Sequence, residues 1–175
     1  HTHTTNSDGN AGPYEVAKWY KDHGYDFLSI TDHNQTTDPT TIKNIADSTF
    51  LLIPGNEISA SNKNVENDTQ GRAIHLNGLN VNRDVPVKFS STVVSTFQDN
   101  IDAIRTAGGI VHLNHPNFHW SFGAKEMLQL KNVSLFEVSN MHPGVDNQGG
   151  GGMPGTEEMW DDMLTSGKRI FGIAT

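Results

Sequence analysis

The chain has 175 residues, enough to bury a hydrophobic core, and no cysteine, which excludes both disulfides and thiolate metal sites. Its net charge of −8 argues against a nucleic-acid surface or an anionic membrane as a partner. A small anionic substrate stays compatible with this charge, because bound metal ions would dominate the field inside a site. No apolar run approaches the roughly 20 residues of a membrane-spanning helix.

The predicted elements alternate between helix and strand from the start. A helix is expected over Pro13–His23, because proline suits a first helical position and Gly24 suits the end. A short apolar strand is expected over Asp26–Ile30. Asp38 followed by proline predicts the start of a second helix, with its apolar residues on one face.

The middle of the chain continues the pattern. Phe50–Ile53 is predicted to be a strand that ends at Pro54-Gly55, and the polar residues 60–71 are predicted to form an exposed loop. Ala73–Leu79 is expected to be a strand. Apolar residues at helical spacing over Val93–Ile104 then predict a helix.

The last part adds strands over Ile110–Leu113, Leu135–Val138 and Ile170–Ala174, with an amphipathic helix around Met159–Leu164. Alternating strands and helices predict an α/β fold with parallel strands joined by crossover helices. We find no repeat and no linker, so a single domain over residues 1–175 is expected. Few lysines and many Asn, Thr and Gly favour a periplasmic or secreted protein.

Most predicted strands carry a His, Asp or Glu near one end. His1 and His3 are two residues apart, so on an extended segment both rings point to the same side. In a parallel barrel the carboxyl ends of the strands converge on one mouth, where residues far apart in sequence meet. The candidate metal-binding residues are His1, His3, Asp8, His33, Glu57, His75 and His115.

Taken singly, these residues have ordinary explanations. The His-x-His pair could be chance or a tag remnant, His75 a hydrogen-bonded core histidine, and Glu57 an exposed carboxylate. Together, nine histidines, no cysteine and metal-binding residue types after apolar strands favour a metal site.

The order of these residues resembles the polymerase and histidinol phosphatase (PHP) family of metallohydrolases. The matching segments are His1-Thr2-His3-Thr4, Asp8-Gly9, Ile30-Thr31-Asp32-His33, Gly55-Asn56-Glu57, His75 and His115-Pro116. Three further segments are similar to the branch that includes carbaryl hydrolase: Asn140-Met141-His142-Pro143, Trp160-Asp161 and 171–175. The resemblance implies a distorted seven-stranded β/α barrel, here trimmed at both ends, with up to three metal ions.

The resemblance also implies how the ligands are shared. The implied sets are His1, His3 and Glu57 for a first ion, Glu57, His75 and His115 for a second, and Asp8 and His33 for a third. The family pattern ends with an Asp-x-His pair on the last strand, and these two residues are not among the 175, so seven of the nine expected ligands are present.

Histidine nitrogen and carboxylate oxygen suit two or three divalent ions of Zn, Mn or Fe. Two ions bridged by Glu57 would hold a hydroxide between them as the nucleophile. The expected function is a metal-dependent hydrolase of a small anionic ester, with a phosphoesterase favoured. The alternatives are a carboxyl or carbamate ester hydrolase with the same metals, and a non-catalytic metal-binding module.

Several other polar residues are candidates for contact with the substrate. His142, Arg72 and His119 are the predicted catalytic side chains, although an arginine in a loop such as the one that carries Arg72 is more often simply solvated. Asn114 is a further candidate for substrate contact. Asp32 is expected to orient metal-bound histidine rings, which need hydrogen-bond acceptors.

Overall fold

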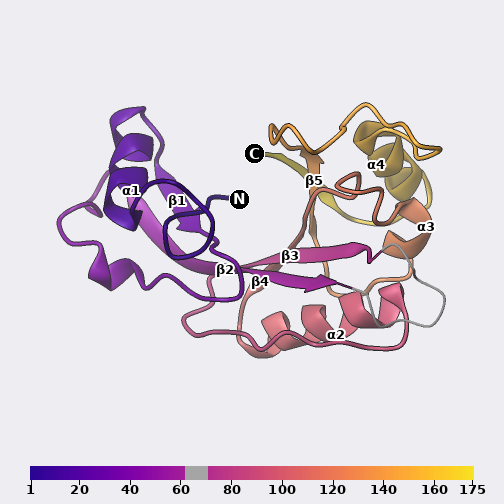
Figure 1. Cartoon of the computed structure of the whole chain (residues 1–175), viewed down its shortest axis with the longest axis horizontal. Helices are drawn as coiled ribbons and strands as arrows, with labels where there is room; N and C mark the ends of the chain where they lie inside the picture. Colours follow the sequence, from indigo (N-terminus) through magenta and orange to yellow (C-terminus); the bar gives the residue numbers. More distant parts are fainter. Residues whose placement is uncertain (62–70) are drawn as a thin grey trace.

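The computed structural model of the chain describes residues 1–61 and 71–175. In this part of the chain the sheet has six strands, paired in sequence order and curled into a half-barrel (Figure 1). The strands are β1 (Phe27–Ile30), β2 (Leu51–Ser61), β3 (Ala73–Leu79), β4 (Ile110–Leu113), β5 (Leu135–Ser139) and β6 (Phe171–Ala174). The helices are α1 (Pro13–Asp22), η1 (Pro39–Thr41, a 3-10 turn), α2 (Val93–Thr106), α3 (Ala124–Met127) and α4 (Thr156–Thr165).

The sheet is mixed, so the prediction of parallel strands throughout is wrong. β1 and β2 are parallel, and so are β4, β5 and β6, but β3 runs antiparallel to both of its neighbours. Only residues 62–72 separate β2 from β3, and a parallel crossover needs a dozen residues or more. The predicted exposed loop at this point falls mostly on residues 62–70, outside the described residues.

β2 does not end at Pro54-Gly55 as predicted but changes partner there. Its first residues pair with β1 as far as Pro54, and residues from Gly55 to Ser61 pair with β3. Proline has no N–H to donate, which suits the point where the ladder changes side. A Cβ on Gly55 would lie 2.3 Å from Ser29 Oγ, so glycine permits this close approach. The continued strand carries Glu57 into the interior.

Three of the four predicted helices form close to the expected bounds, as α1, α2 and α4. The helix predicted from Asp38 is wrong, because only the short η1 forms there. The Asp38 side chain accepts a hydrogen bond from Thr40 N, as in a helix N-cap, but Asn44 has a φ of 62° and lies outside the helical region. The apolar residues Ile42 and Ile45 are buried all the same.

Two apolar cores flank the polar middle of the sheet. The larger core lies between the sheet and α2, α3 and α4, and it includes Ile58, Leu76, Phe97, Phe136 and Met159. The smaller core packs α1 on β1 and includes Ala17, Leu28 and Ile30. Figure 1 shows α1 and β1 at one end of the molecule, β5 and α4 at the other, and both termini between them. None of the helices within the described residues is long and apolar enough to span a membrane.

Candidate metal centre

The N-terminal segment is held beside β1 by its threonines. Thr31 N donates to Thr2 O at 2.8 Å, and Thr2 N donates to Thr31 Oγ1 at 2.9 Å. Thr2 and Thr4 are buried on one side of this segment. Because side chains alternate along an extended chain, His1 and His3 lie on the other side and face the interior.

Asp32 holds the loop that carries Asp8. Its buried carboxylate accepts hydrogen bonds from Thr4 N (2.7 Å), Thr4 Oγ1 (2.8 Å), Ser7 Oγ (2.7 Å) and Thr37 Oγ1 (2.7 Å). Burial alone would raise the pKa of Asp32, but these hydrogen bonds outweigh it and hold the pKa below its usual value. Asp32 therefore orders a loop, whereas the sequence predicted that it orients histidine rings.

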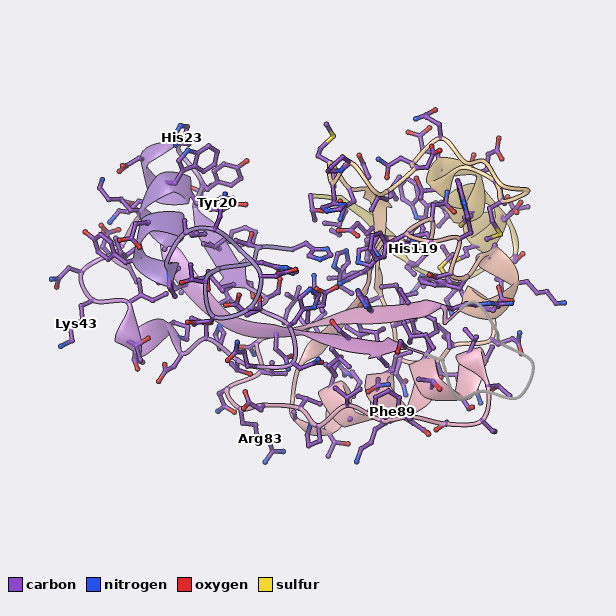
Figure 2. All side chains as sticks on the ribbon, in the orientation of Figure 1. Tyr20, His23, Lys43, Arg83, Phe89 and His119 are labelled. Carbon is purple, nitrogen blue, oxygen red and sulfur yellow. The ribbon has the colours of Figure 1, made fainter. Side chains whose placement is uncertain are left out.

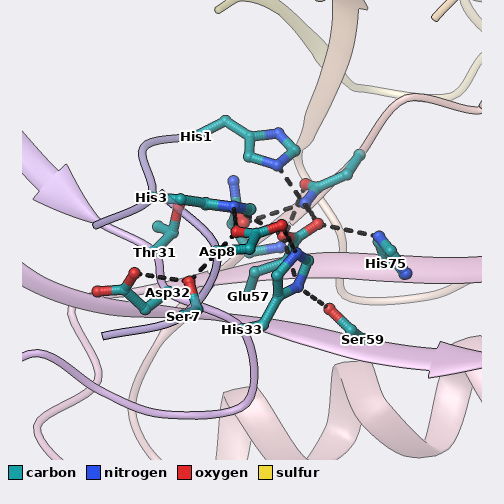
Figure 3. Close-up of polar contacts among 12 residues, drawn as sticks. His1, His3, Ser7, Asp8, Thr31, Asp32, His33, Glu57, Ser59 and His75 are labelled. Carbon is teal, nitrogen blue, oxygen red and sulfur yellow. Dashed lines mark hydrogen bonds and ion pairs between the residues drawn. The ribbon is translucent and has the colours of Figure 1, made fainter. Parts of the chain in front are cut away.

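Glu57 is the centre of the site. It lies on β2, is fully buried, and accepts a hydrogen bond from Asn114 Nδ2 at 2.8 Å. Histidine rings from the N-terminal segment, from the segment after β1 and from β3 surround its carboxylate (Figure 3). The nitrogen–oxygen distances to Glu57 are 3.3 Å from His1 Nε2, 2.9 Å from His3 Nε2, 3.1 Å from His33 Nδ1, 3.2 Å from His75 Nδ1 and 3.4 Å from His115 Nε2.

Burial and neighbouring charges shift the pKa values of several residues in the site. Burial alone would raise the pKa of Glu57, but the surrounding histidines hold this pKa well below its usual range. Burial would lower the pKa of His1, but Glu137 and Glu57 on either side raise it to about 10. Burial lowers the pKa of His33 and of His115, which favours the neutral imidazole that binds metal ions.

Buried polar atoms without a partner indicate that the site fits a cation. His3 Nε2 and Glu57 Oε2 lie 2.9 Å apart, yet both are buried and neither makes a hydrogen bond with a described residue, because their relative orientation does not suit one. His75 Nδ1 is also buried and has no hydrogen-bond partner within residues 1–61 and 71–175. An unsatisfied buried polar atom costs about 1–3 kcal/mol. A divalent ion accepts lone pairs from such nitrogen and oxygen atoms and would remove this cost.

The structure groups the ligand atoms differently from the sets that the resemblance implied. Within the described residues, two groups of three have ligand atoms that all lie within 4.8 Å of one another: His1 with Glu57 and His115, and His3 with Asp8 and His33. His3 Nδ1 lies 2.7 Å from Asp8 Oδ1, and His33 Nε2 lies 3.4 Å from Asp8 Oδ2. His3 is therefore as close to Asp8 as to Glu57.

All seven candidate ligands line one pocket of about 300 Å³, together with Phe118, Asn140, Met141, His142, Val145 and Thr175. Of the three predicted catalytic side chains, only His142 reaches it. Arg72 does not line the pocket, and His119 is exposed on the loop after β4 (Figure 2). Phe118 takes the position that faces the pocket, one residue before His119. Asn114 was predicted to contact substrate, but it is fully buried and bonds to Glu57 and Asn77.

Sequence reasoning missed Glu137. This residue lies on β5, is 1% exposed, and places its carboxylate 2.8 Å from His1 Nδ1. A carboxylate inside an otherwise apolar strand was the signal, because such a group is rarely buried without a partner.

No protein-family model and no curated protein matches the chain. Two solved structures share its fold over 98% of its length. One is a two-domain protein from Bacteroides vulgatus that contains a predicted PHP-like metal-dependent phosphoesterase, with 18% identity and a TM-score of 0.58. The other is a proposed metal-dependent phosphoesterase from Bifidobacterium adolescentis, with 14% identity and a TM-score of 0.67. The chain spans 51% of the first protein and 84% of the second.

At these identities the likeness concerns the fold alone, which the chain shares with these two proteins. The shared fold agrees with the general fold class that the resemblance implied, a resemblance that rests on the order of the histidines and carboxylates along the sequence. The carbaryl-hydrolase branch receives no support from these two structures.

Proposed function

We propose that the chain is a metal-dependent hydrolase of ester bonds, with phosphate esters as the favoured substrates. One observation carries the proposal: a fully buried glutamate with nitrogens of five histidines within 3.4 Å. So many titratable groups close together would destabilise an ordinary core, because some of their buried atoms have no hydrogen-bond partner among the described residues. Perturbed pKa values in a pocket are typical of functional sites.

Different residues of the chain would hold the metal ions, position a ligand and contact the substrate. His1, Glu57 and His115 would hold one ion, and His3, Asp8 and His33 a second, with His75 available beside Glu57. Asn114 holds Glu57 in place by donating a hydrogen bond to its Oε1. Divalent ions bound there, with Zn, Mn and Fe as candidates, would supply a Lewis acid and lower the pKa of water. His142 lies at the pocket wall, where it can contact substrate.

A carboxyl or carbamate ester hydrolase is the second candidate, in line with the carbaryl-hydrolase-like segments. The pocket supports it, because the described lining residues include no lysine or arginine to bind a phosphate, while Phe118, Met141 and Val145 are apolar. An anionic substrate would depend on the metal ions for its counter-charge.

The test compares aryl phosphate with aryl carboxylate hydrolysis by protein supplied with Mn²⁺ or Zn²⁺. The phosphatase proposal expects metal-dependent release from the phosphate ester that a chelator abolishes. Release from the carboxylate ester alone supports the second candidate. Metal binding without hydrolysis of either supports the non-catalytic module, and an absence of metal binding contradicts all three.

We also propose that a seventh strand closes the sheet between β1 and β6. In the part of the chain that the structure describes, both are edge strands with one partner each, and a cavity of about 890 Å³ between them is lined by residues of both strands, including Phe27, Leu28 and Ile173. Apolar side chains in such a gap are stabilised when another strand covers them. A crystal structure of the full-length protein that leaves this gap open would contradict the proposal.

A further inference from the structure

Glu137 connects two of the histidines that surround Glu57. Its Oε1 accepts hydrogen bonds from His1 Nδ1 at 2.8 Å and from Thr175 Oγ1 at 2.6 Å. Its Oε2 accepts one from the backbone N–H of His115 at 2.7 Å. Both oxygens of this buried carboxylate are therefore bonded, which offsets the cost of burying its charge.

When His1 binds a metal ion as a neutral imidazole, its hydrogen bond to Glu137 determines which ring nitrogen keeps its hydrogen. Oε2 accepts from the backbone N–H of His115 and Oε1 from Thr175 Oγ1, so both oxygens of Glu137 act as acceptors. His1 Nδ1 must then be the donor. The other nitrogen of the ring, Nε2, faces Glu57 Oε1 at 3.3 Å.

We infer that Glu137 is a positioning residue of the metal centre: it fixes the tautomer and orientation of His1 so that Nε2 is the metal-binding atom. This inference rests on the proposed metal-dependent function. The same carboxylate also fixes the backbone of His115, which belongs to the same group of ligands as His1. A carboxylate that accepts the second N–H of a ligating histidine raises the basicity of the ring and holds it in place.

Glutamine at position 137 has the same shape but cannot make both sets of contacts. Its one carbonyl oxygen can accept from His1 or from the backbone of His115, and its NH₂ group must then face the other donor. If the NH₂ group faces His1 Nδ1, the ring is driven to the tautomer with hydrogen on Nε2, which has no lone pair for a metal ion. If it faces His115, the segment that carries this ligand is displaced.

The first test titrates ZnCl₂ into metal-free parent protein and into Glu137→Gln by calorimetry. Glu158→Gln is the matched control, since Glu158 is exposed on α4 and the change is chemically the same. We expect roughly 10- to 100-fold weaker binding for Glu137→Gln and unchanged binding for the control. Binding by Glu137→Gln within twofold of the parent would overturn the inference and leave the metal centre intact. An absence of zinc binding by the parent would overturn the proposed function, and the inference with it.

A second measurement needs no variant and decides the matter if Glu137→Gln does not fold. Nitrogen-15 NMR of the zinc-loaded parent distinguishes the two ring nitrogens of His1. We expect a protonated Nδ1 and a metal-bound Nε2. A metal-bound Nδ1 in His1, or a His1 ring without metal contact in a zinc-loaded protein, would overturn the inference, whereas a purely structural Glu137 would not fix this pattern.

Discussion

Replacing Glu57 by glutamine is the sharpest perturbation of the proposed centre, because it removes one charge from a fully buried position with almost no change in shape. Nitrogens of five histidines lie 2.9–3.4 Å from this carboxylate. A unit charge interacting with another at about 4 Å contributes about 4 kcal/mol at an effective dielectric constant of 20. Since every 1.4 kcal/mol is tenfold in affinity and a divalent ion carries two charges, the variant should bind divalent ions more weakly by a factor of roughly a thousand or more.

The assay is the metal content of parent, Glu57→Gln and Glu158→Gln proteins after dialysis against limiting Zn²⁺, with circular dichroism to confirm that each is folded. The exposed Glu158 controls for the loss of one negative charge from the molecule. We expect metal in the parent and the control and almost none in Glu57→Gln. A folded Glu57→Gln that retains metal at the parent level would refute the central role of this carboxylate.

Three further predictions follow from the same geometry. A chelator should lower the thermal midpoint of the parent but not of Glu57→Gln, because an ion present at 100 times its Kd stabilises the folded state by about 2.7 kcal/mol; equal shifts in both proteins would contradict this. His142→Ala should raise KM roughly tenfold, the worth of one hydrogen bond to substrate, with only a small change in the thermal midpoint, since His142 is exposed at the pocket wall and its ring accepts one exposed hydrogen bond, from Gly144 N at 3.0 Å; an unchanged KM would show that His142 does not contact the substrate. Asp32→Asn should destabilise the fold at neutral pH and much less in acid, as measured by urea denaturation.

Local sequence patterns predicted the elements well where the decisive interactions are local. The strand at Ala73–Leu79 and the strand at Ile110–Leu113 form with the predicted bounds, because their apolar runs are bounded by polar residues or glycine. The helix expected after Asp38 failed for a physical reason, since Asn44 adopts a left-handed conformation and a good N-cap cannot propagate a helix by itself. The direction of β3 depends on pairing with distant strands, which periodicity does not encode.

The candidate site was predictable in its members but not in its arrangement. The alternation of His1 and His3 and the position of Glu57 after a strand pointed to residues that do meet in one pocket. Which ligand stands next to which depends on side-chain geometry: His3 is paired with Asp8 by a contact of 2.7 Å that no spacing rule gives. Glu137 was missed because its role comes from contacts with residues more than twenty positions away in the chain.

The pH dependence of Asp32→Asn follows from the four hydrogen bonds that the carboxylate accepts. Asparagine keeps one acceptor oxygen and presents an NH₂ group to donors among Thr4, Ser7 and Thr37, so about half of these bonds are lost. Hydrogen bonds to a charged group contribute about 1.5–3 kcal/mol each, so the loss of two should lower the free energy of unfolding by about 3–6 kcal/mol at neutral pH.

The sign of the pH effect follows from the lowered pKa of Asp32 in the folded protein. Unfolded Asp has a pKa of about 3.9, so the stabilisation is fully present above that value and is lost as the pH falls through the lower pKa of the folded state. The free-energy difference between parent and variant should therefore be constant from neutral pH to about pH 5 and shrink below about pH 4. Measuring both proteins in chelator removes metal binding, and the histidine titrations that they share cancel in the difference. If the free-energy difference between parent and variant grew in acid instead, the Asp32 side chain would be hydrogen-bonded more strongly in its protonated form. Contacts other than those of the Asp32 carboxylate would then hold the loop that carries Asp8.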